Sequence, residues 1–232
     1  MILFIKHIEI EGPETLGAFF VKKGIPLEVV NLHQGEKLSR DLRGLEAVVS
    51  LGGPLNAYEE AGYPFLRDED DFLKKVLAKE IPFLGICLGS QLLAKAAGGC
   101  VVRSPQEEIG WFDIELTEAG VKDPLFAGLP KTLEVYQWHG DMCQLSREAV
   151  LLATAKGCPV QAFRYGTNAY GLQFHAEITD KSIDGLSKDY APGKQHEREA
   201  MLRHYERVKE KFHRHGQVLC ENFLRIMKGG GT

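Results

Sequence analysis

Residues 82–97 read PFLGICLGSQLLAKAA, and this stretch carries the strongest structural signal in the chain. Pro82 to Ile86 is a continuous apolar run, which is typical of a strand buried on both faces of a parallel sheet. Leu88 to Ala97 is rich in good helix formers, and Gly98-Gly99 ends the predicted helix. The stretch therefore predicts a buried strand that turns directly into a helix, with Cys87 at the turn.

The same alternation of strand and helix precedes this stretch. Apolar runs predict strands at 2–5, 27–32 and 47–51, and helical patterns lie at 13–23 and 66–79. After residue 100 the strand candidates follow one another closely, at 112–116, 133–138, 150–154, 160–165 and 169–174. We therefore expect an open α/β sheet whose second half is largely antiparallel or mixed.

From Thr179 onward the sequence becomes polar and helical. Residues 197–211 carry dense alternating charges, and residues 217–227 have apolar residues at helical spacing. We interpret 179–215 as a charged helical insertion or extension, by default a solvated surface segment and alternatively a lid or an interface. Residues 229–232 are expected to be a loose tail. Because no repeat and no Ser/Pro linker divides the sequence, residues 1–232 are predicted to form a single domain.

Composition and charge exclude several classes of protein. Apolar residues make up 44% and charged residues 26%, as in an ordinary globular protein rather than a disordered one. The net charge of -4 provides no basic field that would recruit nucleic acid or an anionic membrane. Lys6, His7 and Glu9 interrupt the apolar start, which therefore lacks the uncharged stretch of a signal peptide or membrane span. We expect a cytoplasmic protein with no nucleic-acid or membrane partner.

The five cysteines must be judged one by one, because they are widely spaced and include no C-x-x-C pair of a disulfide or zinc framework. Gly85 and Gly89 flank Cys87, where a strained strand-to-helix turn leaves no room for side chains. A thiol at a helix N-terminus has a lowered pKa, which favours the nucleophilic thiolate. A lone strand cysteine is usually a small core residue, but this setting predicts a nucleophile. We expect a structural role for the others, Cys100, Cys143, Cys158 and Cys220.

A thiolate that attacks an amide needs an acid to protonate the departing nitrogen, and histidine is the usual choice. His175 ends the strand candidate 169–174, and Glu177 follows two residues later, where a carboxylate can orient the imidazole. Catalytic side chains collect at such carboxyl ends of strands. His7 and His33 have no acid at a suggestive position, and the histidines after residue 190 are interpreted as solvated. The predicted hydrolytic site is Cys87 with His175 and Glu177; the alternative for His175 is a satisfied residue at a sheet edge.

Five motifs, in chain order, resemble those of the class I, or triad-type, glutamine amidotransferases, especially the amidotransferase part of GMP synthetase. They are GGP at 52–54, GICLGSQ at 85–91, EIGW at 108–111, WHGD at 138–141 and QFHAE at 173–177. The resemblance implies a flavodoxin-like open mixed sheet flanked by helices, with a helical C-terminal extension. It also implies hydrolysis of the glutamine side-chain amide through a cysteine thioester, which gives glutamate and ammonia.

The resemblance also implies a role for each matching position. Cys87 resembles the family nucleophile, and His175 and Glu177 complete its triad. The backbone amides of Gly53 and Leu88 resemble the oxyanion-hole donors. The implied contacts of the substrate are Gly52, Gln91, Trp138, His139, Gly140 and Asp141. From the residues alone, Gln91 could instead cover the helix N-terminus, 138–141 could be core and a polar turn, and 108–111 is expected to be architectural.

Two departures from the family limit what the resemblance implies. The usual His-Pro-Glu reads His175-Ala176-Glu177, so the fixed φ of proline is lost and Glu177 is less firmly placed. The sequence contains no glycine-rich phosphate loop of a synthetase, so an ammonia acceptor is expected on a separate synthetase chain. The expected substrate is glutamine or another γ-glutamyl compound, with no metal or organic cofactor. A stand-alone γ-glutamyl hydrolase or peptidase remains the alternative, and a non-catalytic regulatory module fits the retained triad less well.

Overall fold

A computed structural model describes residues 1–39 and 41–230 of the chain, so that Arg40 and the last two residues of the predicted loose tail lie outside it. The strands are β1 (Ile2–Lys6), β2 (Leu27–Asn31), β3 (Ala47–Ser50), β4 (Phe83–Ile86), β5 (Cys100–Leu116), β6 (Thr132–Gln144), β7 (Val150–Thr154), β8 (Ala162–Tyr165) and β9 (Ala169–Leu172). The α-helices are α1 (Glu14–Lys22), α2 (Phe65–Ala78), α3 (Leu88–Ala96), α4 (Glu118–Lys122), α5 (Asp180–Tyr190) and α6 (Gln195–Met227).

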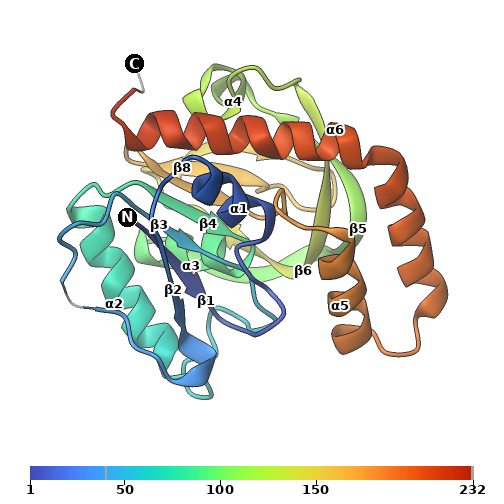
Figure 1. The fold of residues 1–232 in the computed structure, drawn as a ribbon, viewed down its shortest axis with the longest axis horizontal. Coiled ribbons are helices and arrows are strands. Elements are labelled where there is room, and N and C mark those ends of the chain that lie inside the picture. The colour runs from blue at the N-terminus through green and yellow to red at the C-terminus, as the bar shows by residue number, and fades with distance from the viewer. Residues whose placement is uncertain (40, 231–232) are drawn as a thin grey trace.

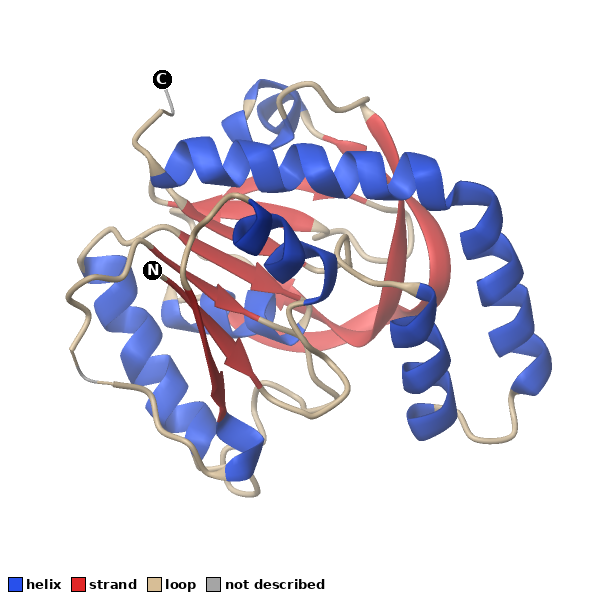
Figure 2. Ribbon diagram, in the orientation of Figure 1, coloured by secondary structure: helices blue, strands red, loops and turns tan. Residues whose placement is uncertain are grey.

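All nine strands of the described chain join one mixed sheet, in the order β2-β1-β3-β4-β9-β8-β7-β5-β6. The strands from β2 to β9 in this order pair in parallel, and those from β9 to β6 pair antiparallel. Helices cover the sheet on both faces (Figure 2). The predicted flavodoxin-like open mixed sheet flanked by helices is confirmed.

Successive residues of the central strands belong to opposite layers of the core. On β1, Ile2 and Phe4 pack in the layer beneath α1 and the C-terminal part of α6, whereas Leu3 and Ile5 pack beneath α2 and α3. Figure 1 shows α6 lying across the sheet on the same side as α1. Two buried layers explain why β1, β3 and β4 read as continuous apolar runs.

The antiparallel strands β5 and β6 are much longer than predicted. The expected ranges were 112–116 and 133–138, but the two strands pair from Cys100 to Glu115 and from Thr132 to Gln144, with a shift in register between Arg103 and Glu108. In the added part of β5 the polar stretch 103–108 separates Val101-Val102 from Ile109 and Trp111, so no continuous apolar alternation reveals the strand. This long ribbon carries the WHGD segment to the carboxyl edge of the parallel strands.

The helical C-terminal extension is present, but the default interpretation of 179–215 as a solvated segment is wrong. This segment contributes five buried side chains to a third apolar cluster, in which they pack with Tyr136 and Ile178. The five are Ile183, Leu186, Met201, Tyr205 and Phe212. Figure 1 shows α6 bent, with its first part beside α5 at the end of the sheet near β5 and β6. No helix within 1–39 and 41–230, the 33-residue α6 included, is long and apolar enough to cross a membrane.

Candidate active site

The turn between β4 and α3 holds Cys87 in a strained conformation, with φ 49° and ψ -106°. Non-glycine residues rarely adopt such angles, and those that do cluster at active sites. A Cβ added at Gly85 would lie 2.7 Å from the Ser90 nitrogen, and one at Gly89 would lie 2.6 Å from the Ser50 carbonyl carbon. The predicted need for glycine on both sides of the turn is therefore confirmed.

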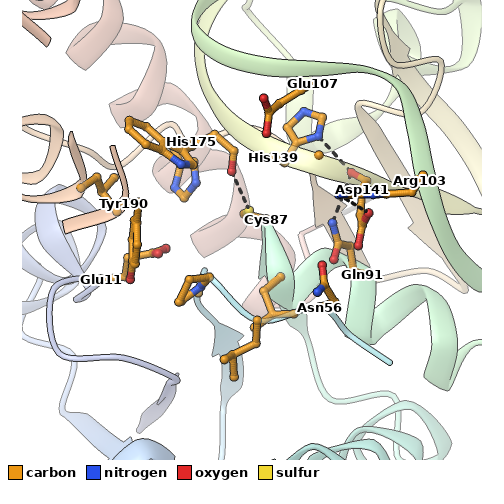
Figure 3. Close-up of a pocket in the computed structure, with 17 residues that line it drawn as sticks. Glu11, Asn56, Cys87, Gln91, Arg103, Glu107, His139, Asp141, His175 and Tyr190 are labelled. Atoms are coloured by element: carbon orange, nitrogen blue, oxygen red, sulfur yellow. Dashed lines mark hydrogen bonds and ion pairs between the residues drawn. The ribbon is translucent and has the colours of Figure 1, made fainter. Parts of the chain in front are cut away.

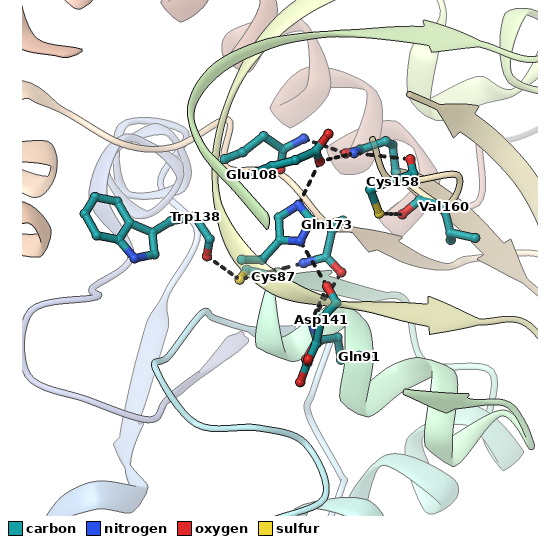
Figure 4. A network of polar contacts seen from close by, with 11 residues as sticks. Cys87, Gln91, Glu108, Trp138, Asp141, Cys158, Val160 and Gln173 are labelled. Carbon is teal, nitrogen blue, oxygen red and sulfur yellow. Dashed lines mark hydrogen bonds and ion pairs between the residues drawn. The ribbon is translucent and has the colours of Figure 1, made fainter. Parts of the chain in front are cut away.

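Neighbouring parallel strands bring Cys87 and His175 to one edge of the sheet. β4 pairs with β9, and the Cys87 N–H donates to the Leu172 carbonyl at 2.8 Å, while His175 follows β9 three residues later. His175 Nδ1 lies 2.6 Å from Glu177 Oε1, so Nδ1 donates to the carboxylate and leaves Nε2 for another partner. The Cys87 thiol donates to the Trp138 carbonyl at 3.8 Å (Figure 4).

The pKa of His175 is raised well above its usual range. Burial by itself lowers this pKa, but the charge of Glu177 and hydrogen bonding by Cys87 and Glu177 outweigh the burial. The imidazolium form is therefore favoured. It can stabilise a neighbouring thiolate and holds a proton that can pass to a leaving group.

The backbone around Glu177 compensates for the missing family proline. The Ala176 N–H, which a proline would lack, donates to Glu177 Oε2 at 2.9 Å. The Glu177 carbonyl accepts from the Thr15 hydroxyl at 2.7 Å and from the Thr15 N–H at 3.2 Å. The carboxylate is thus held toward His175 by contacts that replace the fixed φ of proline.

Two backbone amides beside Cys87 have no acceptor. Neither the Gly53 N–H nor the Leu88 N–H donates a hydrogen bond to any group in 1–39 or 41–230, and both residues line the cavity that contains Cys87. A Cβ added at Gly53 would lie 3.1 Å from Leu88 Cδ2, so the two segments are closely packed. Such a pair of donors can bind an oxyanion.

A buried ion pair that the sequence did not reveal supports the Gly52-Gly53 loop. His7 Nδ1 donates to the Gly52 carbonyl at 3.1 Å, and Nε2 lies 2.7 Å from Glu69 Oε2. The Ser50 hydroxyl donates to the other Glu69 oxygen at 2.7 Å. Burial lowers the pKa of His7, but Glu69 and the Gly52 carbonyl raise it above the usual value overall. Because both ring nitrogens face acceptors, His7 is held as an imidazolium.

The cavity at Cys87 has a volume of about 280 Å³ and gathers most of the predicted site. Its walls include the predicted residues Gly53, Cys87, Leu88, Gln91, Trp138, His139, Gly140, Asp141 and His175. Gly52 and Glu177 do not line it. Gln91 Nε2 donates to the Asp141 carbonyl at 3.4 Å and to Gln173 Oε1 at 3.3 Å, so the Gln91 side chain is fixed at the cavity wall.

Glu108 supports this wall from behind, as the architectural interpretation of 108–111 predicted. His139 Nδ1 donates to the Asp141 carbonyl at 2.9 Å, and its Nε2 lies 3.0 Å from Glu108 Oε2 (Figure 4). In the described chain, Glu108, His139 and Cys158 are also a candidate metal-ligand group, with ligand atoms within 4.8 Å of one another. Burial raises the pKa of Cys158 to about 11, and Gln161 already donates to Glu108 at 2.7 Å. This group therefore fits a hydrogen-bonded support better than a metal centre.

The remaining cysteines lack the setting of Cys87. Burial raises the pKa of Cys220 to about 12 and raises that of Cys143 further, so these thiols stay protonated. Cys100 is exposed on β5. No other cysteine lies at a strained turn, since Cys87 is the one cysteine with positive φ among the described residues.

The mixed sheet and the strained turn define an α/β protein with a cysteine at the junction of a buried strand and a helix, and sequence comparison identifies the family. The model of the family described as "Glutamine amidotransferase class-I" matches residues 14–185. The chain belongs to this family.

Individual relatives agree with this assignment. The chain is 36% identical over 189 residues to the putative glutamine amidotransferase-like protein YfeJ of Salmonella typhimurium, covering 79% of this chain and 78% of that protein. It is 35% identical over 139 residues to a GMP synthase [glutamine-hydrolyzing] of Thermosipho africanus, covering 59% of this chain but 25% of that protein. The crystal structure of a glutamine amidotransferase from Thermotoga maritima superposes with a TM-score of 0.87 at 37% identity, covering 97% of this chain and 96% of that one.

The charged state of His7 can be tested through the pH dependence of stability. A histidine whose pKa is raised by folding stabilises the protein below its unfolded pKa of about 6.5, and this contribution is lost as pH rises through the folded-state pKa. We therefore expect His7→Gln to have a lower free energy of unfolding than the wild type. The difference should be largest near pH 6 and should shrink toward pH 9. Denaturant titrations at several pH values measure it. His196→Gln, at an exposed position of α6, is the control; a His7→Gln loss that stays constant or grows with pH would contradict a charged His7.

Proposed function

We propose that this chain hydrolyses the side-chain amide of glutamine through a γ-glutamyl thioester on Cys87, which yields glutamate and ammonia. The observation that carries the proposal is the strained Cys87 facing the same cavity as His175, whose Nδ1 lies 2.6 Å from Glu177. This arrangement supports the roles of nucleophile for Cys87, acid–base group for His175 and orienting carboxylate for Glu177 in amide hydrolysis. Membership of the class I amidotransferase family supports glutamine as the substrate.

In the first step the Cys87 thiolate attacks the γ-carbonyl carbon of glutamine. The carbonyl oxygen becomes an oxyanion that the N–H groups of Gly53 and Leu88 bind, and the loss of one such donor typically costs about a hundredfold or more in rate. The His175 imidazolium then gives its proton to the departing nitrogen. The C–N bond breaks, ammonia leaves and the glutamyl thioester remains.

In the second step water attacks the thioester carbon. His175, now neutral, accepts a proton from the water, the C–S bond breaks, and glutamate leaves as the Cys87 thiolate is restored. Glu177 keeps the imidazole in orientation and stabilises its cation in both steps. The amide of glutamine gains the elements of one water molecule in the complete cycle.

We assign the amino-acid end of glutamine to the wall formed by Gln91, Trp138, His139, Gly140 and Asp141. The Asp141 carboxylate can accept from the α-ammonium group. Arg103 lines the same end of the cavity and lies 3.3 Å from Asp141. Its guanidinium can bind the α-carboxylate, a pairing for which arginine geometry is well suited.

We place the ammonia acceptor on a separate synthetase chain. The chain matches a quarter of the length of the GMP synthase relative, so an acceptor-using part of such a protein would lie outside the matched region. A stand-alone γ-glutamyl hydrolase is the second candidate, and one observation favours it. The Gly52-Gly53 loop, which carries one of the proposed oxyanion donors, is already held by His7 and by the Gly89 N–H, which donates to the Leu51 carbonyl at 3.1 Å, so no partner is needed to form it.

Replacing the proposed nucleophile should abolish turnover. Cys87→Ala removes the attacking sulfur with little change in volume, so we expect hydrolysis of glutamine to fall to background while circular dichroism and thermal unfolding show an intact fold. Cys100→Ala, at an exposed position, is the matched control and should stay within a few-fold of the wild type. Ammonia release measures both variants, and retained activity in Cys87→Ala would overturn the mechanism.

The two partners of Cys87 should differ in importance. We expect Glu177→Gln to lower kcat less than His175→Ala, because the glutamine side chain can still orient an imidazole that remains present. The loss can still be large, since the corresponding change in serine proteases costs about ten-thousandfold. Steady-state kinetics with glutamine measure the ranking. Equal losses in two folded variants would contradict separate acid–base and orienting roles.

A further inference from the structure

The cavity continues past His175, away from the proposed amino-acid end. Figure 3 shows Glu11 and Tyr190 on one side of Cys87, with Gln91, Arg103 and Asp141 on the other. Pro54 and Leu186 also line the cavity. Because His175 protonates the departing nitrogen in the proposed mechanism, whatever is attached to that nitrogen must occupy the Glu11 end.

Glu11 presents an unpaired carboxylate at this end. The Glu11 carboxylate lies beside the His175 imidazole, with Gly52 next to both. A Cβ added at Gly52 would overlap the carboxylate and would lie 3.1 Å from His175 Cε1. No group in the described ranges forms a hydrogen bond or ion pair with this carboxylate, whereas the nearby Glu9 pairs with Lys6 and His33. Burial raises the pKa of Glu11, Glu177 adds to the rise, and His175 and His7 offset only part of it.

Tyr190, the last residue of α5, adds a second polar group without a partner. Its hydroxyl is buried and forms no hydrogen bond with any described residue. Burial raises the pKa of Tyr190, and the charge of Glu11 contributes to the rise, which places the two groups near each other. Buried polar groups are nearly always hydrogen-bonded in native proteins. Two unpartnered groups at one end of a cavity are what a site with a polar ligand would show.

We infer that this end is a leaving-group subsite for N-substituted γ-glutamyl amides whose amine carries a second, cationic nitrogen, such as the γ-glutamyl derivative of a short diamine. An ammonium group has three donors, which can serve the Glu11 carboxylate and the Tyr190 oxygen together. Leu186 lies one helical turn before Tyr190 on α5 and also lines the cavity, so it provides an apolar wall for the alkyl chain. A leaving amino acid is disfavoured, because it would bring its own carboxylate close to Glu11.

The inference rests on the proposed function and adds no new chemical step. Cys87 attacks the same γ-carbonyl carbon, the C–N bond breaks, and His175 gives its proton to the nitrogen of the diamine instead of to ammonia. Water then releases glutamate from the thioester. The diamine leaves with its second nitrogen still protonated.

The test compares two substrates that differ only in the distal charge. One is the γ-glutamyl monoamide of a linear diamine, and the other is the γ-glutamyl alkylamide in which a methyl group replaces the ammonium. We expect wild-type kcat/KM to favour the diamine derivative by about tenfold or more, in line with hydrogen bonds to charged groups. Glu11→Gln should reduce this ratio to about twofold or less, and Tyr190→Phe should reduce it severalfold. Glu9→Gln, two residues away and already paired, should keep the wild-type ratio.

The outcomes separate the subsite from the mechanism. A wild-type enzyme with no preference for the diamine derivative, or a preference that survives Glu11→Gln, would overturn the subsite. Cleavage of glutamine alone, still dependent on Cys87, would also overturn the subsite and leave the proposed function intact. Hydrolysis that persists in Cys87→Ala would overturn the proposed function itself. If Glu11→Gln does not fold, the kcat/KM values of the wild type decide the question. The subsite requires the diamine derivative to be cleaved better than the alkylamide and the γ-glutamyl amino acid, and any other order would overturn it.

Discussion

The close approach of the α3 backbone to β3 and β4 at the Cys87 turn is the constraint on which the site depends. Gly89 packs against the Ser50 backbone, where any side chain would overlap it. The Gly89 N–H donates to the Leu51 carbonyl, next to the Gly52-Gly53 loop, and the Cys87 N–H donates to Leu172 on the strand that leads to His175. One tight turn therefore fixes Cys87, the Gly52-Gly53 loop and the strand that leads to His175 relative to one another.

The parts of the site that the sequence predicted are those determined locally. The glycines around Cys87 and the two-residue spacing from His175 to Glu177 are visible in short segments, and the structure brings these residues together. The pair of His7 and Glu69 joins positions 62 residues apart, so it depends on how α2 packs. A signal for it exists, because Glu69 stands three residues after Leu66 and four before Leu73, on the buried face of α2.

The same division between local and tertiary determinants applies to the fold. The apolar runs of β1, β3 and β4 revealed the parallel strands, whereas the first part of β5 has no continuous apolar pattern and is recognised by its pairing with β6. In 179–215 the buried Ile183 and Leu186 are diluted among charged residues, so the pattern suggested a solvated segment. In the structure Leu186 and Tyr190 of α5 line the cavity. The charged composition of 179–215 therefore gave no sign that this segment contributes to the site.

The proposed hydrolysis depends on a covalent γ-glutamyl thioester at Cys87. Hydroxylamine reacts with thioesters to give hydroxamates, so it can intercept this intermediate in competition with water. The most direct measurement is the product ratio when the wild-type chain turns over glutamine in increasing hydroxylamine. If the thioester forms, γ-glutamyl hydroxamate rises at the expense of glutamate while ammonia release does not fall. Ammonia release accompanied by glutamate alone, at every hydroxylamine concentration, would contradict it.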